Sequence, residues 1–301
     1  MMRAKKNISA KRKPAWLKRR LPAGKDYENV RRLLDKSCLH TVCQEAKCPN
    51  LWECFSKGTA TFLIMGPRCT RNCHFCAVEH GPETVPDPDE PERVAQAVQT
   101  LNLDYVVVTS VTRDDLPDGG AGHFAATIGN IRKVRPDTFI EVLIPDFQGQ
   151  EAALDLVLAA APDVLNHNLE TIQRLYPRVR PEAIYKRSLD LLRYAHRNHP
   201  DLPIKSGLML GLGETRPEIL SAFEDLRDNG CSLLTLGQYL QPSTAQLPVV
   251  QYIPPEEFEA LRSAALEMGF REVASGPFVR SSYHAKALFR SLNRQKRAHS
   301  P

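Results

Sequence analysis

The chain has 301 residues, of which 42% are hydrophobic and 25% charged, and its formal net charge is +5. This composition excludes wholesale disorder, and the length allows one large domain or two medium ones. No apolar run approaches the roughly 20 residues that a membrane-spanning helix needs, so we expect no membrane association and a cytoplasmic location.

The N-terminal segment is strongly basic. Nine of the first 20 residues are Lys or Arg, and the first acidic residue is Asp26. The segment lacks the apolar core of a secretory signal, and it forms no convincing amphipathic helix before Pro14, which argues against a transit peptide. A second basic run covers residues 290–297. Both ends are either solvated tails or contacts for nucleic acid or an acidic protein, and charge alone does not separate these readings.

Seven of the eight cysteines lie between residues 38 and 76. Without a secretion signal, clustered cysteines indicate metal binding rather than disulfides. After Cys38 they form two triplets, CQEAKCPNLWEC and CTRNCHFC, whose cysteines are Cys43, Cys48 and Cys54, then Cys69, Cys73 and Cys76. Structural zinc sites usually use paired C-x2-4-C motifs, whereas three thiolates suit a cubane iron–sulfur cluster with one iron left open. A zinc knuckle or a chance cluster is the alternative.

The second triplet, CTRNCHFC, resembles the signature of the radical SAM superfamily. The resemblance implies that Cys69, Cys73 and Cys76 hold a 4Fe-4S cluster whose open iron binds S-adenosylmethionine. In that family, reductive cleavage of the sulfonium then gives methionine and a 5′-deoxyadenosyl radical, so the cofactor carries the hard chemistry. Phe75 matches the family's aromatic position, and we expect it to pack beside the bound nucleoside.

The remaining chain alternates between strand and helix patterns. Apolar, β-branched runs predict strands at 60–66, 105–110, 139–144, 164–168, 204–210 and 233–239. Helical patterns occur near 92–101, 123–134, 151–161, 182–196, 216–229 and 255–268. Six such repeats predict an α/β fold with a parallel sheet and right-handed crossovers. They fit a partial (β/α)6 TIM-like barrel, the architecture of the radical SAM family.

Several loops are predicted to leave the same face of this barrel. The signature follows the first strand at its C-terminal end, where barrel enzymes place their active-site loops. Gly119 and Gly120 follow the second strand and resemble the family's glycine pair that meets the methionyl amine. Each such loop alone is an ordinary turn. Their shared location predicts contacts with S-adenosylmethionine or substrate from Gly119, Gly120, Asn168, Glu170, Gly211 and Gln241.

The first triplet is similar to that of the lipoyl synthase family. Further agreement lies in KPAWLKRRLP near the start, in VTRDDLPDGG and MLGLGE, and in GPFVRSSYHA at residues 276–285. The resemblance covers about residues 12–288. It implies a second, auxiliary 4Fe-4S cluster held by Cys43, Cys48, Cys54 and a serine of the RSSY motif, assigned to Ser282. We therefore expect three parts: an auxiliary-cluster extension at 1–58, the barrel at 59–270, and a C-terminal extension at 271–301.

This resemblance implies insertion of two sulfur atoms at C6 and C8 of an octanoyl chain on a carrier lysine. The auxiliary cluster supplies the sulfur, and two S-adenosylmethionine molecules are consumed. The implied partners are octanoylated lipoyl carrier domains, such as the E2 subunit of 2-oxoacid dehydrogenases and the glycine cleavage H protein. A low-potential donor such as ferredoxin or flavodoxin is also implied.

Two rival functions account for part of the sequence. Another sulfur-inserting radical SAM enzyme would lack the first triplet, or would need an RNA-binding module for which this length leaves no room. A function as a metal-containing nucleic-acid-binding protein would not explain the strand–helix repeats or the signature. We therefore expect no nucleic-acid partner. Cys38 is interpreted as a free thiol, and Cys231 as a small buried hydrophobe.

Overall fold

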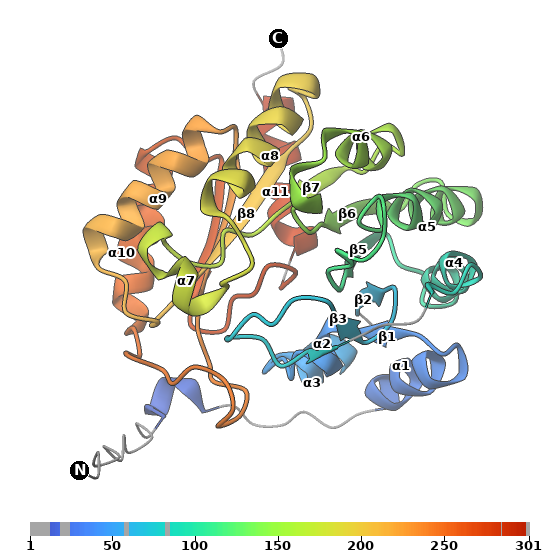
Figure 1. The fold of residues 1–301 in the computed structure, drawn as a ribbon, viewed down its shortest axis with the longest axis horizontal. Helices are drawn as coiled ribbons and strands as arrows, with labels where there is room; N and C mark the ends of the chain where they lie inside the picture. The colour runs from blue at the N-terminus through green and yellow to red at the C-terminus, as the bar shows by residue number, and fades with distance from the viewer. Residues whose placement is uncertain (1–12, 19–24, 57–59, 82–84, 284, 299–301) are drawn as a thin grey trace.

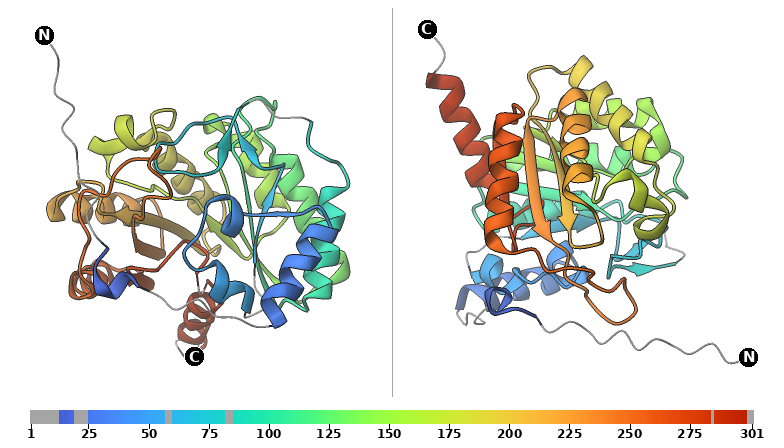
Figure 2. Two further views of the ribbon diagram at one scale, coloured as in Figure 1. Left: turned by 90° about the horizontal axis from the view of Figure 1, so that it is seen from below. Right: turned by 90° about the vertical axis from the view of Figure 1, so that its left-hand side faces the viewer.

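The computed structural model describes residues 13–18, 25–56, 60–81, 85–283 and 285–298 (Figure 1). Its centre is an eight-stranded sheet in the order β1-β2-β5-β6-β7-β8-β9-β10. All neighbouring pairs are parallel except β1 with β2. The sheet curves and carries helices on its outer side (Figure 2), which confirms the predicted partial α/β barrel.

The six predicted strand–helix units are all present. The strands are β2 (Thr61–Ile64), β5 (Tyr105–Ser110), β6 (Phe139–Leu143), β7 (Val164–Asn166), β8 (Ile204–Leu210) and β9 (Leu233–Gln238). The helices that follow them are α4 (Glu90–Thr100), α5 (Ala121–Val134), α6 (Glu151–Ala159), α8 (Tyr185–Asn198), α9 (Arg216–Asp228) and α10 (Pro255–Glu267). The first strand ends two residues earlier than predicted because Met65 and Gly66 take left-handed conformations, with φ of 68° and 86°.

The sequence patterns missed the elements that flank the barrel. A further parallel strand, β10 (Glu272–Gly276), pairs with β9, and the two-residue β1 (His40–Thr41) pairs with β2. The small parallel pair β3 (Arg68–Cys69) and β4 (Glu79–His80) frames the signature loop. The other missed elements are η1 (Ala15–Leu17), α1 (Lys25–Lys36), α2 (Val42–Glu45), α3 (Leu51–Ser56), η2 (Phe147–Gly149), η3 (Gln173–Leu175), α7 (Tyr176–Val179) and α11 (Ala285–Ala298).

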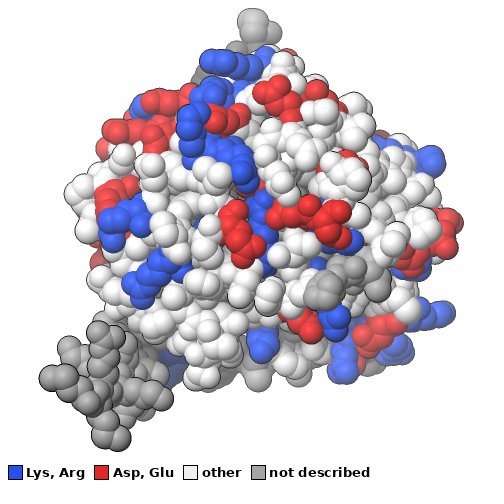
Figure 3. All heavy atoms as spheres, viewed as in Figure 1, with Lys and Arg blue, Asp and Glu red and all other residues white. Residues whose placement is uncertain are grey.

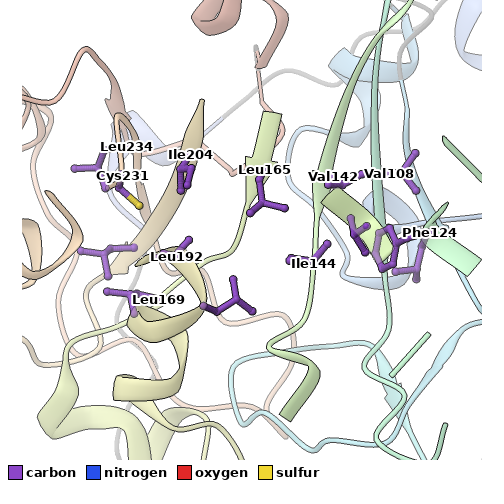
Figure 4. Close-up of a cluster of buried hydrophobic side chains, with 14 of the residues drawn as sticks. Val108, Phe124, Val142, Ile144, Leu165, Leu169, Leu192, Ile204, Cys231 and Leu234 are labelled. Carbon is purple, nitrogen blue, oxygen red and sulfur yellow. The ribbon is translucent and has the colours of Figure 1, made fainter. Parts of the chain in front are cut away.

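One hydrophobic core joins the N-terminal extension to the barrel. Val30, Leu34 and Phe55 of the extension belong to the same buried cluster as the strands and their covering helices. Figure 4 shows part of this cluster, where Val108 and Val142 of neighbouring strands lie near Phe124 of α5. Cys231 is 4% exposed and packs in the same cluster, which confirms its interpretation as a small hydrophobe.

A buried polar network crosses the sheet from β5 to β8. The Glu141 carboxylate accepts hydrogen bonds from Lys205 Nζ at 2.8 Å, Asn166 Nδ2 at 3.0 Å and Tyr105 Oη at 2.6 Å. The side chains of Lys205 and Glu141 are each 1% exposed. A charged pair this deep is tolerated only because both partners are present and further hydrogen bonds satisfy them.

Replacing Lys205 with Met is therefore expected to lower the free energy of unfolding by about 3–5 kcal/mol, because it leaves a buried carboxylate without its cation. The matched control is Lys186→Met, since Lys186 pairs with Asp190 at 2.7 Å but its side chain is 76% exposed. That change should cost less than about 1 kcal/mol. Denaturant unfolding measures both, and equal losses in the two variants would contradict this interpretation of the network.

No helix among the described residues combines the length and apolarity needed to cross a bilayer.

Candidate active site

Three cavities with shared walls run through the barrel and bring the two cysteine triplets together. The amino-end cavity, about 570 Å³, contains all three cysteines of the first triplet and lies beside the start of β5 and α11. The signature-loop cavity, about 240 Å³, contains Cys69, Cys73 and Cys76. Between them, the central cavity of about 410 Å³ shares Cys43, Cys48 and Ser282 with the first, and Phe75 and Cys76 with the second.

The signature loop is held by backbone hydrogen bonds from the barrel loops around it. Thr70 bonds to the Thr112 carbonyl through its backbone N–H at 3.0 Å and its hydroxyl at 2.9 Å. His74 donates its backbone N–H to the Val179 carbonyl at 2.9 Å. In addition, the backbone N–H of Thr112 donates to Cys69 Sγ at 3.3 Å. Hydrogen bonds to a ligating sulfur tune a cluster, so this contact fits a metal-binding thiolate.

Arg71, inside the signature, holds the signature loop in place through ion pairs. Its guanidinium reaches Asp114 at 2.6 Å and Asp146 at 2.6 Å, and its side chain is only 4% exposed. Burial alone would raise the pKa of Asp146, but the hydrogen bonds and charge of Arg71 outweigh it and hold that pKa at about 2. The carboxylate therefore stays ionised at neutral pH and ties the loop to the end of β6.

The first triplet is shaped by a capped helix turn and a left-handed residue. Thr41 caps α2 by accepting the backbone N–H of Gln44 at 3.3 Å, which sets Cys43 in the first turn of that helix. Lys47, with φ of 50°, then reverses the chain so that Cys48 N–H bonds to the Cys43 carbonyl at 3.0 Å. Cys54 follows in α3.

The RSSY segment reaches this triplet from the far end of the chain. Asn50 Nδ2 donates to the Phe278 carbonyl at 2.7 Å, and the Tyr283 hydroxyl donates to the Glu53 carboxylate at 3.0 Å. Gly237 of β9 permits the approach, because a Cβ there would lie 2.1 Å from the Val279 carbonyl oxygen.

The two serines of RSSY have different surroundings. Ser281 Oγ accepts a hydrogen bond from Asn168 Nδ2 at 2.6 Å, and Ser281 lines the central cavity only. Ser282 lines both the central and the amino-end cavities, as Cys43 and Cys48 do. Ser281 is thus engaged by the barrel, whereas Ser282 shares its cavities with the first triplet.

The chemistry of the thiols fits metal ligands rather than nucleophiles. Burial raises the pKa of Cys43 to about 12, of Cys76 to about 12 and of Cys73 to about 11. Catalytic cysteines need a lowered pKa, whereas a metal deprotonates its thiol ligands outright. No three His, Cys, Asp or Glu side chains of the described residues group tightly enough for one metal ion. A cubane, in which each thiolate holds a different iron, does not need so tight a group.

Four of the residues predicted to contact S-adenosylmethionine or substrate line these cavities. Phe75, Asn168 and Glu170 line both the central and the signature-loop cavities, and Gln241 lines the central cavity. Glu170 takes a left-handed φ of 65°, a strained conformation of the kind that concentrates at functional sites. Burial raises the pKa of its carboxyl group.

The predicted glycines line none of these three cavities. Gly119 and Gly120 have positive φ, and a Cβ on Gly120 would lie 2.2 Å from Met65 Sδ. Gly211 has φ of 102° and packs beside Gln238. All three therefore have conformational reasons to be glycine. Cys38 is exposed and also lies outside the three cavities.

Sequence reasoning missed the buried cations around the signature. Arg180, 9% exposed, donates to the carbonyls of Asn168 and Leu169 and lines the signature-loop cavity. Arg71 was visible inside CTRNCHFC, but nothing local distinguishes it from a surface arginine. The partly buried Arg280 lines both the central and the amino-end cavities, and its place in the RSSY motif predicted no separate role for it.

His167 in the signature-loop cavity makes stability depend on pH. Its Nδ1 lies 2.9 Å from the Ile144 carbonyl oxygen, which can only accept, so Nδ1 carries the proton and Nε2 accepts from Ser188. Burial, and then the charge of Arg180, lower the pKa of His167 to about 4. Because the unfolded chain binds this proton near pH 6.5, stability is lost as pH falls from 6.5 towards 4.

We expect this loss to reach about 3 kcal/mol, on the scale of 1.36 kcal/mol for each pKa unit. Denaturant midpoints between pH 7 and pH 4 measure it, with His167→Gln as the variant that removes the titrating group. The variant should lose less stability than the unaltered chain over this range. Parallel pH curves for the two proteins would contradict the assignment.

Comparisons with known proteins agree with this geometry. A family model described as the radical SAM superfamily matches residues 63–226, so the barrel and its signature loop are those of a radical SAM enzyme. A second model, the N-terminal domain of lipoyl synthase, matches residues 1–48. Among solved structures, a methylornithine synthase superposes with a TM-score of 0.52 at 12% identity, covering 78% of this chain and 80% of that one. A maturase of the FeFe-hydrogenase gives 0.53 at 13% identity, covering 89% and 74%. These likenesses establish the fold.

Two curated relatives define the family more narrowly. Lipoyl synthase of Desulfotalea psychrophila is 58% identical over 278 residues, covering 92% of this chain and 93% of that protein. Lipoyl synthase of Chlorobaculum tepidum is 54% identical over 285 residues, covering 94% and 97%. The chain therefore belongs to the lipoyl synthase family.

Proposed function

We propose that this chain inserts two sulfur atoms, at C6 and C8, into an octanoyl group carried on a protein lysine, which forms the lipoyl cofactor. The observation that carries the proposal is the central cavity, whose walls include cysteines of both triplets. A radical generator and a sulfur source can then act on one octanoyl group held between them.

The radical-generating half rests on Cys69, Cys73 and Cys76 as ligands of a 4Fe-4S cluster. When bound, this cluster and S-adenosylmethionine supply the carbon radical that unactivated C–H bonds require. Arg71 and Thr112 hold the loop that carries the three thiols. We assign Phe75, Asn168, Glu170 and Gln241 to S-adenosylmethionine or substrate on the basis of their cavity positions, and retain Gly119, Gly120 and Gly211 as supports of the surrounding turns.

The sulfur-supplying half rests on Cys43, Cys48, Cys54 and Ser282 as ligands of an auxiliary 4Fe-4S cluster. The Glu53–Tyr283 and Asn50–Phe278 hydrogen bonds support this assignment because they tie the serine segment to the cysteine segment. A serine oxygen is a harder ligand than a thiolate, so its iron should be the easiest to release.

The central cavity suits an acyl chain. Its walls include apolar side chains from α2 and from four strands or their ends, namely Val42, Leu143, Leu208, Met209, Leu240 and Val279. An apolar pocket removes the octanoyl chain from water and keeps reactive species away from solvent. Lys13, Lys47 and Gln241 also line the cavity and give it a polar side.

The macromolecular partners follow from this substrate. We propose octanoylated lipoyl carrier domains, including those of 2-oxoacid dehydrogenase E2 subunits and the glycine cleavage H protein, with ferredoxin or flavodoxin as the electron donor. Figure 3 shows Lys and Arg gathered over α8 with Asp and Glu close by, so this face is mixed in charge. Most of the basic N-terminal tail lies outside the described residues, and its contact with an acidic protein, for which a carrier domain is the candidate, stays a prediction. The three-part division at residues 58 and 270 also stays a prediction.

Incubation of the reconstituted protein with S-adenosylmethionine, reductant and an octanoyl-lysine peptide tests the proposal. Mass spectrometry should find a singly thiolated peptide first and the lipoyl peptide later. Cleavage of S-adenosylmethionine without sulfur in the peptide would contradict the proposed reaction.

A further inference from the structure

The auxiliary triplet borders two cavities that lead to opposite ends of the barrel. The central cavity extends to Gln238, Tyr239 and Gln241, at and beyond the carboxyl end of β9. The amino-end cavity instead reaches Thr61 at the start of β2 and Tyr105 at the start of β5. Cys43, Cys48 and Ser282 line both, whereas Cys54 lines the amino-end cavity alone.

The amino-end cavity extends from the buried thiol of Cys43 to the protein surface. Cys43 at its inner part is 4% exposed. At its outer part, Asp104 pairs with Lys286 at 2.5 Å and with Arg290 at 2.9 Å. The side chains of these three residues are 50%, 43% and 58% exposed. Their ion pairs cross from the loop before β5 to α11, and because they are exposed they are weak and open readily.

The amino-end cavity opens to the surface among charged side chains. The amino-end cavity has many polar or charged side chains, including Asn50, Glu53, Thr61, Asp104, Lys286 and Arg290. Ions and hydrated species pass such a lining more easily than an acyl chain does. The central cavity also has charged residues in its walls, including Lys13, Lys47 and Glu170, but substrate fills it in the proposed reaction, so ions would need another route to the auxiliary site.

We propose that the auxiliary site takes up iron and sulfide through the amino-end cavity, past the Asp104 ion pairs, while the central cavity serves the acyl substrate. The inference rests on the proposed function, in which the auxiliary cluster gives up its sulfur and must be refilled. Only transit of ions is assigned to the cavity; no bond is made or broken there. Separate routes allow refilling while the acyl peptide still occupies the central cavity.

The test follows iron uptake instead of product. In the full chain with Cys69, Cys73 and Cys76 all replaced by Ala, the auxiliary site is the intended iron site. Metal-free protein receives ferrous iron, enriched in the Mössbauer-active isotope, with sodium sulfide and dithiothreitol. Cluster formation is timed by Mössbauer and visible absorption spectra. Circular dichroism checks that every variant is folded.

Ala287 is exposed on α11 and lines the amino-end cavity, so Ala287→Trp narrows it. We expect uptake to slow at least tenfold. The matched control, Ala152→Trp, changes an exposed alanine of α6 outside this cavity and should leave uptake unchanged. The double variant Lys286→Ala/Arg290→Ala removes both ion pairs and should speed uptake.

The same iron-uptake experiment is repeated with saturating octanoyl-lysine peptide. The peptide should leave the rate of iron uptake unchanged. Unaltered uptake in both the narrowed and the opened variants would overturn the proposal, as would strong inhibition by the peptide. Failure of the proposed function has a different signature. In that case the unaltered chain makes no thiolated peptide, although the variants still differ in iron uptake.

Discussion

Replacing Cys54 with Ala is expected to abolish sulfur insertion while S-adenosylmethionine is still cleaved. Cys54 lines the amino-end cavity and neither of the other two, so its loss should spare the signature loop. Bound iron should fall from about eight to about four atoms per chain, since each cubane holds four. The measurements are iron and sulfide content, release of 5′-deoxyadenosine, and the mass of the peptide.

The reciprocal variant is Cys73→Ala, which should reduce both 5′-deoxyadenosine release and sulfur insertion to background. Its iron should also fall towards about four atoms, held by the other triplet. Cys38→Ala is the matched control, because Cys38 is exposed and outside all three cavities. If Cys54→Ala and Cys73→Ala lost the same activities, the division of labour between the triplets would be wrong.

The second large effect is expected at Ser282. Ser282→Ala should remove one ligand of the auxiliary cluster, lower its occupancy and reduce two-sulfur insertion to background. Ser281→Ala should retain the iron, because Ser281 Oγ is occupied by its hydrogen bond from Asn168. Losing that bond costs about 1 kcal/mol of stability. Equal loss of iron in the two variants would contradict the assignment of Ser282.

The variant Ser282→Cys distinguishes binding of the auxiliary cluster from release of its serine-bound iron. A thiolate should hold the cluster at least as well as the serine, so the iron content should be retained. If the harder oxygen ligand helps its iron to leave, sulfur insertion in a single turnover should slow. Normal two-sulfur insertion by this variant would show that the weak ligand is not needed.

The barrel was predictable because its strands are rich in apolar residues and are buried on both faces. The structure places β5 at Tyr105–Ser110 and β8 at Ile204–Leu210, the same bounds that the hydrophobic pattern predicts. β10 was missed because Glu272–Gly276 is an edge strand with only Val273 buried. The helix expected from residue 182 begins at Tyr185, and the Glu182 carboxylate, which lies before it, accepts the Asn72 backbone N–H.

The site was predictable where its residues are close in sequence. The spacing of each cysteine triplet is local, and both triplets line cavities that adjoin the central one. Ser282 came from a motif resemblance, because no spacing rule connects it to Cys54. Arg180 and Asp146 have no local signature, and they reach the signature loop only through the fold of loops after β7 and β6.

Labelling the auxiliary sulfide with a heavy sulfur isotope tests the central claim most directly. The protein is reconstituted with labelled sulfide, freed of excess, and given S-adenosylmethionine, reductant and octanoyl-lysine peptide for one turnover. Because Cys43, Cys48, Cys54 and Ser282 are assigned to the sulfur source, both sulfur atoms of the lipoyl peptide should carry the label, and Cys54→Ala should yield none. Unlabelled product formed from sulfide added later would contradict the account.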